Sequence, residues 1–359
     1  MIEGNKHVSH PGVYVKDAIE ALGLSQSEFA LRSGLSIKNV STLCSGESNI
    51  TLEVATKLAS FFGNSVEGWI NLQTRYGVFL NEENRRKEYE RDYEIAKTID
   101  RSFIRDCLNL EIDPKNKEKT VDSLRKAFGV GALYNLRHPD IYAFCKSAAI
   151  KDISEKNIIL RNAWISLAEI RARDIKCSKF DREAIIASLP LIRSLTKEDP
   201  SIFLPKLMAI LNATGVKLVI LPYLSGSNIG GVTKWIAQEN CVMVAINDCG
   251  KEASRIWFAL AHELGHVMNN HKRHMTISYE KGKIEDKEER EADNFARKTF
   301  LDDKAYEDFV KERRFSIDAI EAFSNKEGVA DFMVIGRLKK DGYLPWSAFQ
   351  EHNVYYEVI

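Results

Sequence analysis

The feature that most constrains this chain is His262-Glu263-Leu264-Gly265-His266, which stands in an apolar, helix-periodic run over residues 254–270. In an α-helix, positions i and i+4 lie one turn apart on the same face, so both imidazoles can bind one tetrahedral Zn²⁺. Glu263 is rotated by about 100° from His262, which places its carboxylate beside the metal-bound water rather than on the metal. We therefore expect one zinc ion per chain, with Glu263 as the candidate general base.

The helix around this motif is apolar enough to be buried. Ile256, Leu260 and Leu264 recur every four residues, which is the spacing of one helix face. Buried imidazoles need partners, and a metal ion supplies them. Two alternatives stay open: a pair of core histidines hydrogen-bonded to backbone, and a metal site that is purely structural or has lost catalysis.

A catalytic zinc needs a third protein ligand and an open fourth position. His271 and His274 are close in sequence, but the metzincin pattern requires Gly and His where this chain has Asn269 and Lys272. That class is excluded.

Downstream, residues 288–296 predict a helix rich in carboxylates. Glu289 and Asp293 stand at i and i+4, so one can bind the metal while the other accepts the remaining N–H of a ligating histidine. Glu291 points to the opposite side of that helix. We expect Glu289 as the third ligand and Asp293 as the partner of a histidine, with Glu291 or Glu288 as the alternative ligand. If the histidines hold no metal, the segment is an exposed acidic turn.

The length of 359 residues favours two or three compact units. β-branched runs at 216–221 and 241–246, with a glycine-led run at 230–236 between them, predict a small sheet. The segments before it and from residue 253 onward show helical periodicity. The expected fold is mainly α with a small β-sheet (α+β). The expected parts are an N-terminal all-α domain (1–76), a charged connecting helix (77–119), a helical subdomain (120–200) and a zinc-binding domain (201–359).

Residues 12–76 predict short helices with clear end signals. Ser25 and Glu28 fit a capping box, and that helix ends near Gly34. Ser36 can cap a second helix over 37–44, and a third follows over 52–62. Two helices joined by a tight glycine-containing turn are typical of a helix-turn-helix.

The connecting segment mixes charges of both signs without Gly or Pro over residues 79–103. Pairs at i,i+4 support an exposed helix. Tyr89, Tyr93 and Ala96 form a narrow apolar stripe on it, which can pack on the chain's own body or on a second copy. A solvated connecting helix and a dimer contact both remain open.

Charge and cysteine content bear on the compartment. Lys+Arg and Asp+Glu both number 51, and no apolar run has the length of a membrane span. We expect a cytoplasmic protein without membrane contact. The six cysteines form no CxxC pair and are expected to be reduced and mostly buried. They are Cys44, Cys107, Cys145, Cys177, Cys241 and Cys249.

The runs at 255–266 and 289–296, the strands before them and the segment 328–344 are together similar to the ImmA/IrrE family of zinc metallopeptidases, over residues 120–359. The resemblance implies a gluzincin-like endopeptidase with His262, His266 and Glu289 as ligands and Glu263 as base. It also implies an action on a repressor, which relieves transcription of stress or mobile-element genes.

The N-terminal segment resembles the Xre-type helix-turn-helix of HigA-like antitoxins. The resemblance lies in His10-Pro11-Gly12, the runs at 24–30, 34–36, 45–46 and 50–52, and Trp69-Ile70-Asn71-Leu72-Gln73. It implies that the helix from residue 37 is the recognition helix, which enters the major groove of double-stranded DNA. The implied DNA-binding residues are Gln26, Ser36, Lys38, Asn39 and Thr42.

Residues 1–76 carry six Lys or Arg and seven Asp or Glu, a net charge of −1. Phosphate attraction supplies most nonspecific DNA affinity, so a monomer should bind weakly and a homodimer on a palindromic operator would compensate. A helical domain used for protein contact is the alternative. We expect a DNA-binding regulator of its own promoter with a zinc endopeptidase domain that cleaves a repressor or antitoxin. The alternative function is a HigA-like antitoxin whose metal domain binds a toxin or senses without proteolysis.

Overall fold

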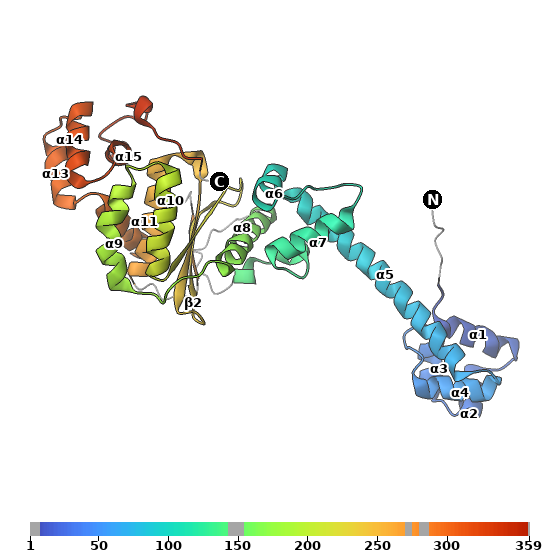
Figure 1. Cartoon of the computed structure of the whole chain (residues 1–359). Helices are drawn as coiled ribbons and strands as arrows, with labels where there is room; N and C mark the ends of the chain where they lie inside the picture. The colour runs from blue at the N-terminus through green and yellow to red at the C-terminus, as the bar shows by residue number, and fades with distance from the viewer. Residues whose placement is uncertain (1–7, 143–153, 270–274, 280–286, 358–359) are drawn as a thin grey trace. The chain divides into compact units, whose positions relative to one another are not determined.

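The computed structural model describes residues 8–142, 154–269, 275–279 and 287–357. The chain divides into two compact units, Met1–Glu90 and Arg91–Ile359. Most elements are helices, and the strands form a single small sheet (Figure 1). This confirms the α+β prediction. No helix among the described residues has the length and apolar character to cross a membrane.

The first unit contains the predicted short helices. They are α1 (Pro11–Ala21), α2 (Gln26–Ser33), α3 (Ile37–Cys44) and α4 (Leu52–Phe62), followed by the start of α5 (Val66–Thr98). The capping box is present, because the Ser25 hydroxyl accepts from the Glu28 N–H and the Glu28 carboxylate accepts from the Ser25 N–H. Phe29, Val40 and Leu58 lie in the buried core of this unit. The predicted bounds of α3 and α4 are confirmed.

Helix α5 is longer than predicted, so the expected boundary between residues 76 and 77 falls inside it. The segment 77–119 is not one helix: α6 (Arg101–Leu108) and α7 (Lys117–Phe128) follow α5. Asp92 is 0 % exposed and accepts hydrogen bonds from Arg125 and from the N–H groups of Leu133 and Tyr134. Tyr93 and Ala96 are buried beside it. This end of the stripe therefore packs on the chain's own body.

The sheet has four strands in the order β1-β3-β2-β4. They are β1 (Val216–Leu221), β2 (Ile229–Ile236), β3 (Cys241–Asn247) and β4 (Met275–Tyr279), with β1 and β3 parallel and the other pairs antiparallel. The first three were predicted. The expectation of helix throughout from residue 253 is wrong at β4. This strand has only five residues and owes its conformation to pairing with β2, a contact that local periodicity does not reveal.

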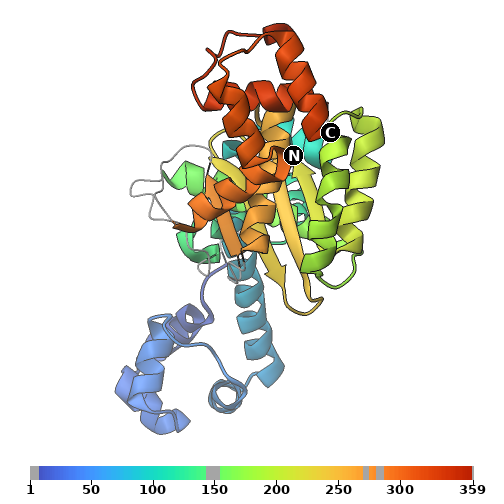
Figure 2. The same ribbon diagram turned by 90° about the vertical axis from the view of Figure 1, so that its left-hand side faces the viewer.

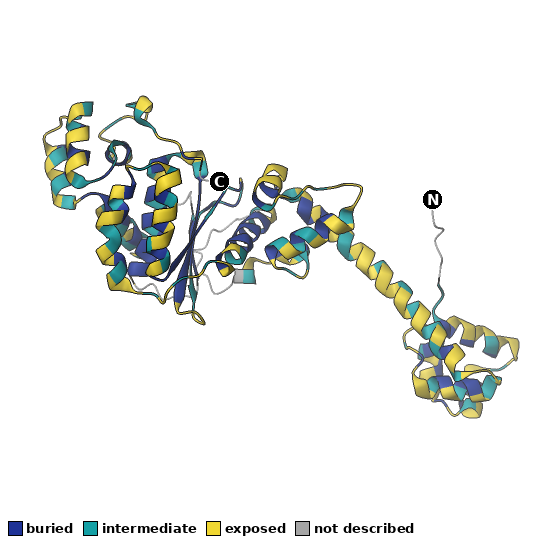
Figure 3. Ribbon diagram, viewed as in Figure 1, coloured by how far each residue is buried: buried dark blue, intermediate teal, exposed yellow. Residues whose placement is uncertain are grey.

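Helices cover both faces of the sheet (Figures 1 and 2). On one face lies α8 (Glu155–Arg173), which is dark blue along most of its length in Figure 3 because it also packs on α7 and on the 3₁₀ turn η1 (Leu133–Arg137). On the other face lie α9 (Arg182–Leu195), α10 (Pro200–Ala213) and α11 (Ala253–Met268). Residues 120–200 and 201–359 therefore belong to one compact unit.

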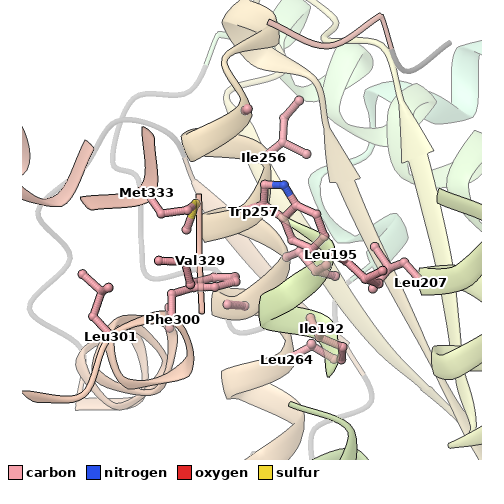
Figure 4. Close-up of a cluster of buried hydrophobic side chains, with 14 of the residues drawn as sticks. Ile192, Leu195, Leu207, Ile256, Trp257, Leu264, Phe300, Leu301, Val329 and Met333 are labelled. Atoms are coloured by element: carbon pink, nitrogen blue, oxygen red, sulfur yellow. The ribbon is translucent and has the colours of Figure 1, made fainter. Parts of the chain in front are cut away.

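The remaining elements follow the sheet in sequence. They are α12 (Lys287–Phe300), α13 (Asp303–Lys311), α14 (Ile317–Glu327) and α15 (Asp331–Lys340), with 3₁₀ turns η2 (Pro139–Tyr142), η3 (Cys249–Lys251) and η4 (Gln350–His352). Figure 4 shows Trp257 and Leu264 of α11 among side chains of α9, α10, α12 and α15. This shared core holds α11 and α12 in fixed positions.

Candidate metal centre and DNA-binding helices

Helices α11 and α12 approach each other closely at a glycine. A Cβ atom on Gly265 would lie 2.8 Å from both Cα and O of Ala292, a separation that real side chains do not adopt. Only glycine therefore permits this approach, which brings the two histidines of α11 opposite the carboxylates of α12.

The three predicted ligands converge. His262 Nε2 lies 3.1 Å from His266 Nε2 and 3.2 Å from Glu289 Oε2, and His266 Nε2 lies 3.5 Å from Glu289 Oε1. Zn–N and Zn–O bonds of about 2.0–2.2 Å in a tetrahedron separate neighbouring donor atoms by about 3.4 Å. The donor set, two imidazoles and one carboxylate, is also one that catalytic zinc uses. The residues present therefore fit a zinc ion.

Asp293 lies behind His262. The Nδ1 atom of His262 is 2.8 Å from Asp293 Oδ1, which favours a proton on Nδ1 and leaves the Nε2 lone pair directed toward Glu289 and His266. Burial acts to lower the pKa of His262, but its hydrogen bonds to Asp293 and Glu289 outweigh burial and raise that pKa to about 10. Zinc binding at Nε2 would displace the proton that this raised pKa otherwise keeps on the ring.

Glu263 is 1 % exposed and lies against the sheet. Thr233 on β2 donates its hydroxyl hydrogen to Glu263 Oε2 at 2.7 Å, and Ser278 on β4 also hydrogen-bonds the carboxylate. A Cβ on Gly231 would lie 2.4 Å from Glu263 Oε1, so glycine leaves room for this side chain. Burial raises the pKa of Glu263 to about 7, a value suited to proton transfer near neutral pH.

The alternative ligand Glu291 pairs with a lysine of its own helix. Glu291 is 3.6 Å from Lys287 on the partly exposed side of α12, and Glu288 is half-buried. His271 and His274 are outside the described residues. Thr233, Ser278 and Gly231 were not predicted as site residues, because strand pairing rather than any local motif brings them to α11.

Two arginines of α9 hold the ends of both ligand-bearing helices. Arg182 Nε donates to the carbonyl oxygen of Met268, in the last turn of α11, at 3.2 Å. Arg193 donates to the carbonyls of Lys298 and Thr299 near the end of α12. Cations at helix C-termini satisfy free carbonyls and favour the helix dipole. Helix α9 therefore helps to set the position of α12 relative to α11.

In the first unit, α2 and α3 form the predicted helix-turn-helix. Gly34 makes the turn with φ 71°, and Ser36 caps α3 by accepting from the Asn39 N–H at 3.1 Å. Lys38 and Asn39 are exposed on α3, and Gln26 is exposed at the start of α2. These three side chains are available to DNA.

Two of the implied DNA-binding side chains make internal contacts. The hydroxyl of Thr42 lies 3.0 Å from the Lys38 carbonyl oxygen and 3.1 Å from Ser48 Oγ, and the Ser36 hydroxyl serves as the helix cap. Ser41, which was not predicted, is exposed on α3. Ser41 stands three residues after Lys38, so both lie on the same face of α3. Helical spacing from Lys38 could therefore have predicted that Ser41 is exposed on this face.

Two family models match the chain. A helix-turn-helix model matches residues 15–69, and the model described as Peptidase U49 matches residues 237–322. The first range contains α2 and α3. The second contains His262, Glu263, His266 and Glu289.

Two of the similar proteins are described as transcriptional regulators. An uncharacterized HTH-type transcriptional regulator of Haemophilus influenzae is 37 % identical over 71 residues, which is 20 % of this chain and 66 % of that protein. The uncharacterized HTH-type transcriptional regulator YddM of Escherichia coli is 31 % identical over 68 residues, 19 % of this chain and 72 % of that protein. The chain thus spans about two thirds of the length of these relatives.

Among solved structures, an addiction module antidote protein of a HigA family from Coxiella burnetii is similar to this chain. It is 28 % identical, with a TM-score of 0.23, and the match covers 23 % of this chain and 92 % of that one.

Proposed function

Since this chain belongs to the HTH-type transcriptional regulators and carries a Peptidase U49 domain, we propose that it is a DNA-binding regulator whose second unit is a zinc-dependent endopeptidase. The observation that carries the proposal is the convergence of three side chains, whose donor atoms lie 3.1–3.5 Å apart, beside the buried carboxylate of Glu263. The proposed substrate is a repressor or antitoxin protein of a stress-response, toxin–antitoxin or mobile-element circuit.

The proposed roles follow from the contacts. His262, His266 and Glu289 would hold the ion, and Asp293 keeps the His262 ring in place. Zinc would supply Lewis acidity at the scissile carbonyl. Glu263 takes a proton from the attacking water and returns it to the leaving amine. Thr233 and Ser278 hold the carboxylate of Glu263 in place.

The sheet supplies a surface for the substrate. Strand β4 lies at the edge of the sheet, next to β2, and its Ser278 Oγ is 3.4 Å from His266 Nε2. An extended peptide that pairs with a free strand edge gains main-chain hydrogen bonds. We therefore place the substrate backbone along β4.

Zinc content tests the metal centre. Protein purified without chelator is expected to contain one zinc per chain by elemental analysis, and the His262→Ala/His266→Ala double variant to contain none. Removal of the metal with a chelator should stop cleavage of a casein or repressor substrate, and added zinc should restore it. A zinc content well below one per chain, in protein that remains folded, would count against the proposal.

The DNA-binding half of the proposal concerns Lys38, Asn39 and Gln26, which are exposed on α2 and α3. We propose that they contact the operator upstream of the chain's own gene. The net charge of −1 on residues 1–76 limits the phosphate attraction of one copy. We therefore propose that two copies bind a palindromic operator together.

A gel shift at 50 and 200 mM salt tests this half with the upstream DNA. The affinity of the protein should fall at least about tenfold between the two salt concentrations, as expected for two or more phosphate contacts. Lys38→Ala should weaken binding and reduce the salt dependence. Lys57→Ala removes the same charge from α4, where Lys57 pairs with Glu53, and serves as the control. Absence of any shift at 50 mM salt would instead support a domain for protein contact.

A further inference from the structure

A cluster of cations stands next to the proposed metal centre without a role in it. Glu289, Asp293 and Arg297 are spaced four residues apart, so all three side chains share the face of α12 that meets α11. Helices α11 and α12 run in opposite directions here, because His266 faces Glu289 whereas His262 also faces Asp293. Arg297 therefore lies one turn beyond Asp293, toward the start of α11.

Helix α15 brings a second cation to the same place. A Cβ on Gly336 would lie 3.0 Å from Ser254 Cβ, so α15 crosses α11 closely at this point. One turn later, Lys340 Nζ lies 3.9 Å from the centre of the Phe258 ring. The Phe258 and His262 rings have centroids 6.4 Å apart. The amine of Lys340 thus lies over a residue that is one helical turn before His262 on α11.

The positive charge of this cluster exceeds the negative charge that faces it. Arg337 is paired with Asp341 at 2.5 Å, and one oxygen of Asp293 is bonded to His262. Within the described residues, Arg297 Nε is buried without a hydrogen-bond partner, and Lys340 has no ion pair. Burial lowers the pKa of Lys340, and the charges of Arg297 and Arg337 act in the same direction, whereas Asp293 and Asp341 raise it. A buried donor without a partner is costly.

We propose that Arg297 and Lys340 form a carboxylate-binding subsite beside the metal centre, with Phe258 as its floor. This inference rests on the proposed peptidase function and adds a substrate class to it: peptides with a carboxylate about two residues from the scissile bond. An extended peptide advances about 3.3 Å per residue, so two residues span about the separation of the Phe258 and His262 rings. The carboxylate can belong to an acidic side chain or to a free peptide C-terminus.

Hydroxamate-capped dipeptides test the subsite through binding, without any need for turnover. Three probes share one backbone: one has Gln and an amidated end, one has Glu and an amidated end, and one has Gln and a free C-terminal carboxylate. Isothermal titration calorimetry measures their affinity for the zinc-loaded full chain. At least one probe with a carboxylate should bind at least about tenfold more tightly than the neutral probe. The preferred carboxylate probe identifies the source of the charge.

Variants separate the subsite from the metal centre. Lys340→Met should remove most of the extra affinity for the carboxylate probe and should change the affinity for the neutral probe by no more than about twofold. Lys340→Arg keeps the positive charge and should retain the extra affinity. Arg297→Met is the second test of the same pair. Lys326→Met, a change at an exposed lysine on α14, is the matched control and should keep the gain.

The outcomes distinguish the two proposals. Equal affinity for the three probes, or a gain that survives in both Lys340→Met and Arg297→Met, would overturn the subsite alone. If no probe binds the zinc-loaded protein, the metal centre as proposed is wrong and the subsite fails with it.

Discussion

Glu263→Gln is expected to abolish peptide cleavage while the protein keeps its zinc. The amide has nearly the same shape and can still accept from Thr233, which lies 2.7 Å from the carboxylate, but it cannot take a proton from water. Loss of a general base lowers turnover by about 10²- to 10⁴-fold. Turnover of a repressor or antitoxin substrate and zinc content by elemental analysis check the two halves of this prediction.

The matched control is Glu291→Gln, on the same pair of helices but paired with Lys287 away from the metal centre. It should leave both turnover and zinc unchanged, and a loss of zinc would show that Glu291 is the third ligand after all. Suppose that Glu263→Gln changes no phenotype in cells, while Lys38→Ala and Asn39→Ala abolish operator binding. That result would favour the alternative function, an antitoxin whose metal domain does not cleave protein.

Gly265→Ala is expected to disrupt the metal centre without changing any ligand. The added methyl group would lie 2.8 Å from backbone atoms of Ala292, and backbone cannot move aside as a flexible side chain can. Overpacking of this kind costs about 1–3 kcal/mol, which the structure avoids by separating α12 from α11. Glu289 then loses its contact with the histidines. Zinc affinity, measured by competition with a chromophoric chelator, should fall by about 10- to 100-fold.

Gly77→Ala is the control for this change. Gly77 lies in α5 with open space where a Cβ would stand, so alanine should maintain or slightly raise stability because it favours the helix. A Gly265→Ala protein that binds zinc as tightly as the unchanged chain would show that the close helix approach is not what positions Glu289.

The predictions that the structure confirmed concern local features, which are set by residues a few positions apart in the sequence. The Ser25–Glu28 capping box and the bounds of α3 and α4 follow from caps and glycines a few residues away. The placement of His262 and His266 on one face of a helix follows from their spacing of four, and so does the placement of Glu289 and Asp293. Helix geometry fixes such relations whatever the rest of the chain does.

The sequence did not predict β4, although it lies only seven residues after α11. A five-residue edge strand gains its conformation from pairing with β2, some forty residues earlier. The partners of Glu263 were missed for the same reason, because Thr233 and Ser278 belong to those two strands. Nothing in either strand's own composition marks it as part of a site.

The amino-acid order alone thus determined which side chains are the candidate zinc ligands and base and on which helices they stand, because helix periodicity and caps are local interactions. Only the tertiary structure decided that Glu289 rather than Glu291 meets the histidines, that Gly231 and Gly265 leave the space they need, and that Lys340 lies over the Phe258 ring. Those relations depend on the packing of α11 against α12, α15 and the sheet, which buries apolar surface from segments far apart in the chain.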